Sequence, residues 1–437
     1  MAAAAIVKGA GSPTGRRTLA YQALVLFSFI YYARPEDFIP GLDIIPLGKI
    51  SGGIALLALI FTVMGKRTGY KMPTEVKVLL VLFGHMILTI PFSVWRGGAF
   101  NTVFQKFSKG VIIALLIGMI VGAMWELRRL LWTQAAAVAL VTVLSVLIHP
   151  GGGWRLSGIQ KGILENANDL AINIAINFPL CVAFLLGSRG VVKKGVWGLG
   201  LAFMIYAVVI TYSRGGLLAL IMSGLICLWE FGVKGRRFHV LMTAGIVFIV
   251  AAGVALSTPH FIKRMQSLVQ GNIKGSGDRG SLEAREELLK ESIRIALQHP
   301  IVGVGPGMFP VFTNYWAVAH NTYTELAAEA GFPALTLFLM ALGGAFRNLR
   351  RVRKSPSYDE DKELQLWTGA LWASLAGYMV GAMFASTEYN LFPYFMIAYT
   401  CALYRIAYTP VTSVNQPEDG INFQNDGADR KQLAWTR

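Results

Sequence analysis

The chain has 437 residues, of which 54% are hydrophobic and only 15% are charged, and its formal net charge is +16. Its mean hydropathy of +0.52 is far above that of a soluble protein, and its apolar runs are continuous rather than alternating, which excludes a transmembrane β-barrel. A basic chain suggests nucleic-acid binding, but here the basic residues lie in short loops between apolar runs, where membrane topology places them. We therefore expect an all-α polytopic membrane protein that binds no nucleic acid.

Apolar segments recur along the whole chain, and each is long enough, or nearly so, to cross about 30 Å of hydrocarbon. We count about twelve, which predicts roughly twelve transmembrane helices. No internal repeat relates them. The segments span residues 19–33, 50–64, 76–92, 108–125, 130–148, 168–186, 195–211, 215–232, 238–256, 323–346, 365–386 and 391–409.

The distribution of basic residues predicts how these segments are oriented, because cytoplasmic loops of membrane proteins are enriched in Lys and Arg. If the amino terminus is cytoplasmic, the most basic loops all lie on the cytoplasmic side. The rule leaves Arg96, Lys106 and Lys109 on the outer side, where an anionic ligand would explain them. The basic loops are 66–71, 128–129, 189–194, 234–237 and 347–362.

This orientation divides the chain into five parts. Residues 1–18 form a cytoplasmic segment, residues 19–256 hold the first nine spans, and residues 257–319 form one long, partly helical periplasmic loop. Residues 320–409 hold the last three spans, and the polar tail 410–437 is expected to be disordered. Both termini are therefore predicted to be cytoplasmic.

Three segments that start on the outer side carry polar residues at their starts. They are LENANDLA with Asn166 and Asn168, SRGG with Arg214, and AHNTYTELAAE with His320 and Asn321. A helix start offers unpaired backbone N–H groups and the positive end of the helix dipole, which favour anions such as phosphate. The glycines after Arg214 would let a bulky ligand approach the backbone, although an arginine at a span end often only extends to the interface.

His320 is the candidate general base. Thr322-x-x-Glu325 has the spacing of a capping box and Asn321 is an alternative cap, so His320 lies just before the helix. The positive helix end disfavours imidazolium and is expected to lower the pKa of His320, which leaves a neutral imidazole as a proton acceptor near neutral pH. The alternative is an ordinary interfacial histidine that only forms hydrogen bonds.

The stretch SLEAREELLKESIRIALQ in the outer loop contains a second candidate arginine. Helical spacing places Arg285 on the apolar face of this stretch and Arg294 on the opposite face. An arginine on a buried face needs a partner, either a carboxylate of the protein or a ligand phosphate that it holds with two hydrogen bonds. The apolar face is predicted to comprise Leu282, Leu289, Ile293 and Ala296.

Metal-ligand patterns are missing from the sequence. The three cysteines, Cys181, Cys227 and Cys401, lie inside apolar segments and have no metal-ligand spacing. No Asp-x-Asp pair lies on the outer side, so we do not expect converging carboxylate oxygens for a divalent cation there. We expect neither a metal nor another cofactor.

Four motifs in order carry a resemblance to a known family. SRGG at a span start, Arg285 followed by Leu289 in an outer helix, HPIVGVGPGMF, and AHNTYTELAAEAGF resemble the O-antigen ligase and O-antigen polymerase superfamily, most strongly over residues 200–345. LENANDLA resembles an Asn-rich element of the same family. The resemblance implies a glycosyltransferase of the bacterial inner membrane that takes a glycan from undecaprenyl diphosphate at the periplasmic face, without a metal.

The resemblance also implies roles and partners. His320 would be the base, and Arg214 and Arg285 would bind the diphosphate. The acceptor would be a lipid A–core sugar, another glycan repeat or a protein hydroxyl, and the long outer loop favours the bulky lipid A–core. A transporter is the alternative from another class, disfavoured because the two halves show no matching hydropathy. The candidates for positioning the substrate are Asn166, Asn168, Asn321 and Tyr323.

Overall fold

The computed structural model describes residues 19–65 except 38 and 40, then residues 72–148, 155–158, 166–235 and 277–408. Within these ranges every regular element is a helix, and no strand is formed. The predicted segments 1–18, 238–256 and 410–437 lie outside the described residues, as does the predicted outer loop before residue 277.

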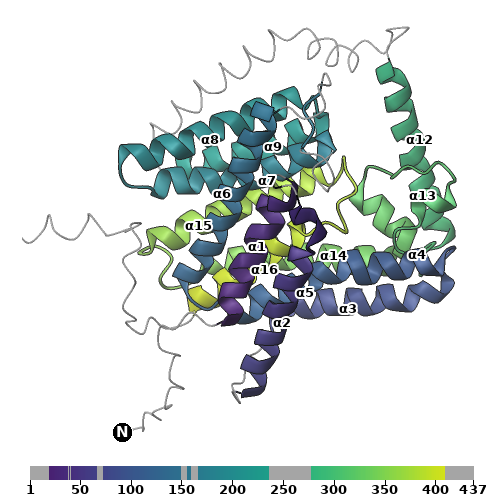
Figure 1. The fold of residues 1–437 in the computed structure, drawn as a ribbon, viewed down its shortest axis with the longest axis horizontal. Coiled ribbons are helices and arrows are strands. Elements are labelled where there is room, and N and C mark those ends of the chain that lie inside the picture. Colours follow the sequence, from purple (N-terminus) through teal and green to yellow (C-terminus); the bar gives the residue numbers. More distant parts are fainter. Residues whose placement is uncertain are drawn as a thin grey trace, which may run out of the picture.

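Figure 1 shows α3 and α14 side by side, with α12, α13 and α4 at one end of the pair. A π-helical turn over residues 102–107 joins α4 to α5, and a second one over residues 228–233 extends α9. The α-helices are α1 (Leu19–Ala33), α2 (Leu47–Gly65), α3 (Thr74–Thr89), α4 (Arg96–Asn101), α5 (Ser108–Ile120), α6 (Met124–Ile148), α7 (Ala167–Gly187), α8 (Val191–Ile210), α9 (Arg214–Cys227), α12 (Gly277–Gln298), α13 (Phe309–Phe312), α14 (Thr322–Val352), α15 (Lys362–Gly381) and α16 (Phe392–Tyr408).

Seven helical stretches in the described part of the chain are long and apolar enough to cross a membrane. The prediction of an all-helical protein with several candidate transmembrane helices is confirmed for the described residues. The predicted total of about twelve transmembrane helices stays a prediction. Two shorter apolar helices, Leu19–Ala33 and Leu47–Ala58, add to them. The seven are Thr74–Phe92, Arg96–Ile120, Met124–Ile148, Ala167–Gly187, Val191–Ile210, Arg214–Val233 and Thr322–Val352.

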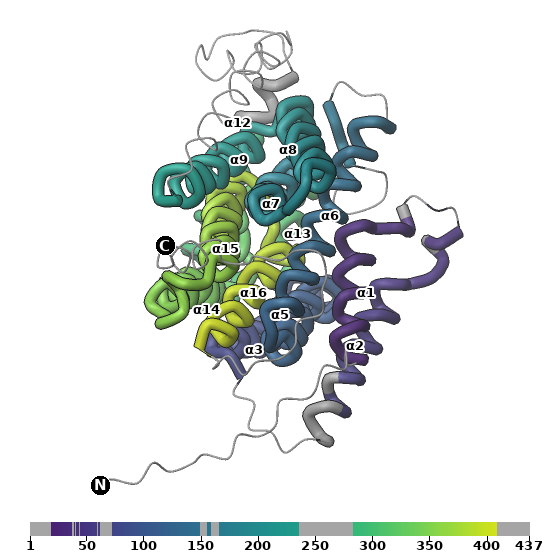
Figure 2. Tube along the Cα trace, turned by 90° about the vertical axis from the view of Figure 1, so that its left-hand side faces the viewer, coloured from purple at the N-terminus to yellow at the C-terminus, as the bar shows by residue number. Residues whose placement is uncertain are grey.

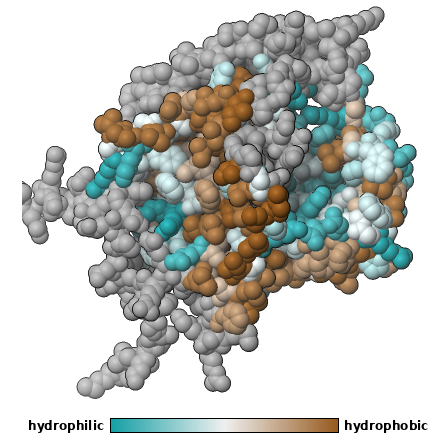
Figure 3. Space-filling model, in the orientation of Figure 1, coloured by the Kyte–Doolittle hydropathy of each residue, from teal (hydrophilic) through white to brown (hydrophobic). Residues whose placement is uncertain are grey.

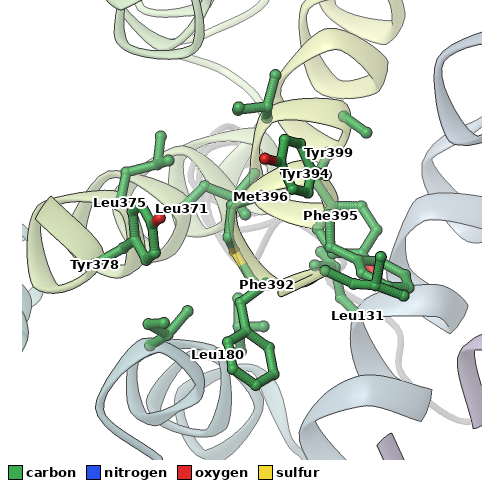
Figure 4. Close-up of a cluster of buried hydrophobic side chains, with 14 of the residues drawn as sticks. Leu131, Leu180, Leu371, Leu375, Tyr378, Phe392, Tyr394, Phe395, Met396 and Tyr399 are labelled. Carbon is green, nitrogen blue, oxygen red and sulfur yellow. The ribbon is translucent and has the colours of Figure 1, made fainter. Parts of the chain in front are cut away.

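Helix α16 lies inside the bundle, with α15 and α5 on either side of it and α1 paired with α2 at the edge (Figure 2). Its side chains Phe392, Phe395 and Met396 pack against Leu131 of α6 and Leu180 of α7 (Figure 4). Figure 3 shows apolar side chains across the middle of the outer surface and hydrophilic ones toward the end that holds α12 and α13. An apolar outer surface around a packed interior is what lipid-facing helices require.

Helix α14 is broken in the middle, at Gly331. Gly331 has φ 78° and ψ 172°, and the ring of Pro333 has no N–H to donate to the carbonyl of Glu329. Two backbone N–H groups of the preceding loop replace the lost donors: Val304 donates to Ala328 O over 2.9 Å and Gly305 donates to Glu329 O over 2.8 Å. Irregular backbone within a span is stable when protein groups satisfy it in this way.

The N–H of Phe332 is satisfied from the same side, because it donates to the carbonyl of Pro300 over 2.8 Å. The loop Pro300–Phe309 therefore lies against the broken part of α14. Its glycines Gly303, Gly305 and Gly307 all have positive φ, and a Cβ on Gly303 would lie 2.2 Å from the backbone carbon of Glu329.

We expect Gly331→Ala to destabilise the protein by about 2 kcal/mol or more, because the alanine must adopt positive φ and its Cβ would lie 2.3 Å from the carbonyl oxygen of Ile301. Gly343→Ala in the same helix is the matched control, since its Cβ would meet nothing within 4 Å. Thermal unfolding in detergent measures both variants. Equal melting temperatures for the two variants would contradict this account of the break.

Candidate functional site

The starts of α7 and α9 pack directly against each other. A Cβ on Gly216 would lie 2.2 Å from the Cβ of Ala171, so glycine is required for the helices to approach this closely. On its other side, α9 touches the segment that joins α15 to α16, because a Cβ on Gly215 would lie 2.3 Å from the Cβ of Phe384. The paired glycines after Arg214 thus serve the close packing of helices.

The segment 382–387, which we call the linker, also holds the start of α14. The N–H of Thr322 donates to Ala382 O over 2.9 Å, and its hydroxyl donates to Ala385 O over 2.7 Å. The N–H of His320 donates to Ser386 Oγ over 3.1 Å. Since the linker also contacts α9, it brings the starts of α9 and α14 to the same place, and with them the predicted residues Arg214 and His320.

Arg155 connects the starts of α7 and α9 and was missed by the sequence analysis. Its Nη2 donates to Asn168 Oδ1 over 3.3 Å, and its Nε donates to the carbonyl of Thr211 over 2.9 Å. The available signal was an arginine in a predicted outer loop shortly before the Asn-rich start of α7, which the positive-inside rule does not explain. The three polar helix starts singled out in the sequence therefore converge at one end of the bundle.

The four asparagine and tyrosine candidates all make contacts within the protein. Asn166 is the N-cap of α7 and accepts from the N–H of Asn168 over 2.9 Å. Asn321 is the N-cap of α14 and accepts from the N–H groups of Tyr323 and Thr324. The hydroxyl of Tyr323 donates to Met379 O over 2.9 Å. A role for these four side chains toward a substrate stays a prediction.

His320 lies just before Asn321, the N-cap of α14. It is half-buried, and its backbone is left-handed, with φ at 55°. Burial, and secondarily the positive charge of Arg285, lower the pKa of His320 to about 4. The predicted direction of the shift is confirmed, but the causes are burial and an arginine, where the sequence analysis had named the helix end. At neutral pH the imidazole is therefore neutral and able to accept a proton.

Helix α12 places Arg285 near His320, on a face that differs slightly from the predicted one. Ile293 is 43% exposed, so its assignment to the buried face was wrong. The observed buried face is rotated about the helix axis relative to the predicted face by a fraction of a turn. Residue spacing alone does not resolve such a rotation. Arg285 precedes Leu288 by three positions and so shares its side of the helix. The buried residues of α12 are Leu288, Ser292, Ile295 and Ala296.

Two further contacts of α12 bear on the site. Ser292 Oγ donates to Thr324 Oγ1 over 2.8 Å, which anchors the helix against the first turn of α14. Arg294 is exposed and pairs with Glu291 of the same helix, as expected for a residue on the solvent side. The two arginines of α12 therefore differ in environment, and it is Arg285 whose charge reaches His320.

Two buried glutamates of α14 hold the surrounding loops, and the sequence analysis assigned neither this role. Glu329 accepts from the N–H groups of Gly307 and Phe309 over 2.7 and 3.0 Å, and from the hydroxyl of Tyr389 over 2.6 Å. Glu325 accepts from the N–H of Ala319 over 2.8 Å and from the Ser386 hydroxyl. A carboxylate within an apolar segment was the signal for both, because such a group requires polar partners.

Among the described residues, no group of three or more His, Cys, Asp or Glu side chains is placed to hold a metal ion. The polar groups that meet at this end include arginines, a neutral histidine and the starts of three helices, with the buried Glu325 bonded to the surrounding backbone. This combination favours an anionic ligand with a hydroxyl group to be deprotonated beside it.

The chain was compared with curated proteins and with models of protein families. No curated protein matches the chain. A family model described as O-antigen ligase matches residues 199–339, a stretch that contains Arg214, Arg285 and His320. The match confirms the resemblance carried by the sequence motifs. Over residues 199–339, this match supports a relationship of the chain to the O-antigen ligase superfamily.

Proposed function

We propose that this protein is an O-antigen ligase-like glycosyltransferase that moves a glycan from undecaprenyl diphosphate to a hydroxyl of the lipid A–core. The observation that supports the proposal most directly is the pairing of a neutral histidine with Arg285, whose positive charge acts on His320. A base with a cation in its vicinity is what transfer from a diphosphate to a hydroxyl requires.

In this reaction the acceptor oxygen attacks the anomeric carbon, the bond from that carbon to the phosphate oxygen breaks, and undecaprenyl diphosphate leaves with the bonding electrons. His320 takes the proton of the acceptor hydroxyl as the new bond forms. Arg214 and Arg285 bind the diphosphate and stabilise the charge that develops on it. Attack opposite to the leaving group inverts the configuration at the anomeric carbon.

Arg155 joins this set as a third candidate for binding phosphate. Its contacts to Asn168 and Thr211 hold the guanidinium between the starts of α7 and α9, where backbone N–H groups favour an anion. Asn168 then acts through Arg155, which it holds in place, while Asn166, Asn321 and Tyr323 shape the helix ends around it.

We place the protein in the bacterial inner membrane with both termini cytoplasmic and this site facing the periplasm. The undecaprenyl-linked glycan, the lipid A–core acceptor and membrane lipids are its partners, and no cofactor takes part. The positive-inside rule supports this orientation, because the most basic loops then lie in the cytoplasm.

The activity is tested by incubating the purified protein with an undecaprenyl-diphosphate glycan and, separately, lipid A–core, a second glycan repeat unit or an acceptor protein. We expect a single modified lipid A–core band on a gel. A ladder of lengthening glycans would instead assign a polymerase, and a modified protein would assign a protein O-oligosaccharyltransferase. Energised uptake of substrate without any transfer would indicate a transporter.

We expect transfer to continue at its full rate after incubation with EDTA, because arginines and helix starts supply the positive charge that a divalent cation supplies in other enzymes. The measurement compares initial rates with and without chelator, and then after addition of Mg²⁺ or Mn²⁺. A loss of transfer that either cation restores would contradict the metal-independent mechanism.

A further inference from the structure

The two peptide groups that flank Ala319 are held by one carboxylate. The N–H of Ala319 donates to Glu325 Oε2 over 2.8 Å. The N–H of His320 donates over 3.1 Å to Ser386 Oγ, and the hydroxyl of Ser386 donates to the same Glu325 oxygen. The two N–H groups thus reach one oxygen atom, one directly and the other through a serine.

Glu325 is not acting as a helix cap in this arrangement. A glutamate in a capping box bonds back to the N–H of the capping residue, but Asn321 caps α14 with its own side chain. Glu325 instead reaches beyond the cap, to the two residues that precede it. It is 2% exposed, so its carboxylate depends on these partners for hydrogen bonds.

The contacts matter because the backbone of His320 is in an unfavourable conformation. With φ at 55°, a residue that carries a Cβ is strained, and surrounding contacts must hold it there. The linker supplies them from one side and the first turn of α14 from the other. Releasing the N–H of His320 lets the residue return to negative φ, which turns its imidazole in another direction.

We propose that Glu325 and Ser386 are positioning residues, which fix the imidazole of His320 by holding the backbone of Ala319 and His320. This inference rests on the proposed function for its catalytic consequence, but the placement of the imidazole is a property of the free protein. Ser386 belongs to the linker and lies 66 residues from His320 in the sequence. Among the described residues, its hydroxyl is the only side-chain oxygen to which the N–H of His320 donates.

The first test measures the chemical accessibility of His320 without any substrate. Purified protein is treated with diethyl pyrocarbonate at neutral pH, and mass spectrometry follows modification of the peptide that contains His320. We expect Ser386→Ala to increase the modification rate several-fold and Ser386→Thr, which keeps the hydroxyl, to retain the wild-type rate. Ser355→Ala is the matched control, because it removes a serine hydrogen bond to the carbonyl of Val352 at the opposite end of α14, away from Ala319 and His320.

The second test measures transfer by the same variants. We expect Ser386→Ala to lower kcat roughly tenfold to a hundredfold with little change in the KM for the donor, since the phosphate-binding arginines are intact. Glu325→Gln keeps one accepting oxygen and is expected to lie between wild type and Ser386→Ala. Ser386→Thr should restore kcat, and Ser355→Ala should retain it.

Wild-type accessibility of His320 in both Ser386→Ala and Glu325→Gln would overturn the positioning role. So would equal losses of kcat in Ser386→Ala and Ser355→Ala, because the loss would then be a general effect of loosening α14. Failure of the proposed function has a different result: the protein would transfer no glycan to any acceptor, while the modification rates still report whether Glu325 and Ser386 hold His320.

Discussion

Replacing His320 with alanine is expected to reduce glycan transfer by roughly 10²–10⁴-fold, which is the range for removing a general base. Without the imidazole, the acceptor hydroxyl has no neutral proton acceptor beside the diphosphate. Binding of the donor should be almost unchanged, because the arginines remain. The loss is therefore expected in kcat, with a similar KM for the undecaprenyl-linked glycan.

The measurement requires purified variants with equal amounts inserted in the membrane. His299→Ala is a suitable control, since His299 lies at the end of α12 with its ring against Phe312 over a centroid distance of 5.8 Å. We expect this control to keep its transfer activity. Full activity in His320→Ala would exclude His320 as the base. Capping of α14 by Asn321 would then be the remaining role of this stretch.

Replacing Arg285 with alanine is expected to lower kcat/KM by roughly 10²–10³-fold, because a charge-assisted donor to the leaving diphosphate is lost. Arg294→Ala is the matched control: Arg294 belongs to the same helix, is exposed and pairs with Glu291. Arg285→Lys keeps the charge without the two-pronged geometry, so an intermediate rate is expected. Equal activity in the alanine variants of Arg285 and Arg294 would exclude the diphosphate role.

The pH dependence provides an independent check on the same residue. His320 accepts a proton only when neutral, so activity falls as the pH decreases through its pKa, which is about 4 in the wild type. The charge of Arg285 disfavours imidazolium, so its removal raises that pKa and moves the acidic limb of the kcat/KM profile to higher pH. The residual activity of Arg285→Ala is sufficient to follow the limb. An unchanged limb would mean that Arg285 does not act on His320.

A further comparison concerns the glutamates of α14. Sequence spacing makes Glu325 the partner of Thr322 in a capping box, with Asn321 as the alternative cap, and it predicts no role for Glu329. In the structure, Glu325 bonds to the residues before the cap, and Glu329 joins the Pro300–Phe309 loop to Tyr389. Spacing within one helix shows which groups lie on the same turn, but it does not show which distant loop will supply their partners.

The helical class, the candidate spans and the residues His320, Arg214 and Arg285 followed from the sequence alone. Hydropathy and helix-start chemistry are local properties, so they are readable from neighbouring residues. Only the tertiary structure decided that the starts of α7, α9 and α14 meet, because the linker 382–387 and Arg155 join them across long sequence separations. It likewise decided the break at Gly331, since the donors that replace the lost helical hydrogen bonds come from another loop.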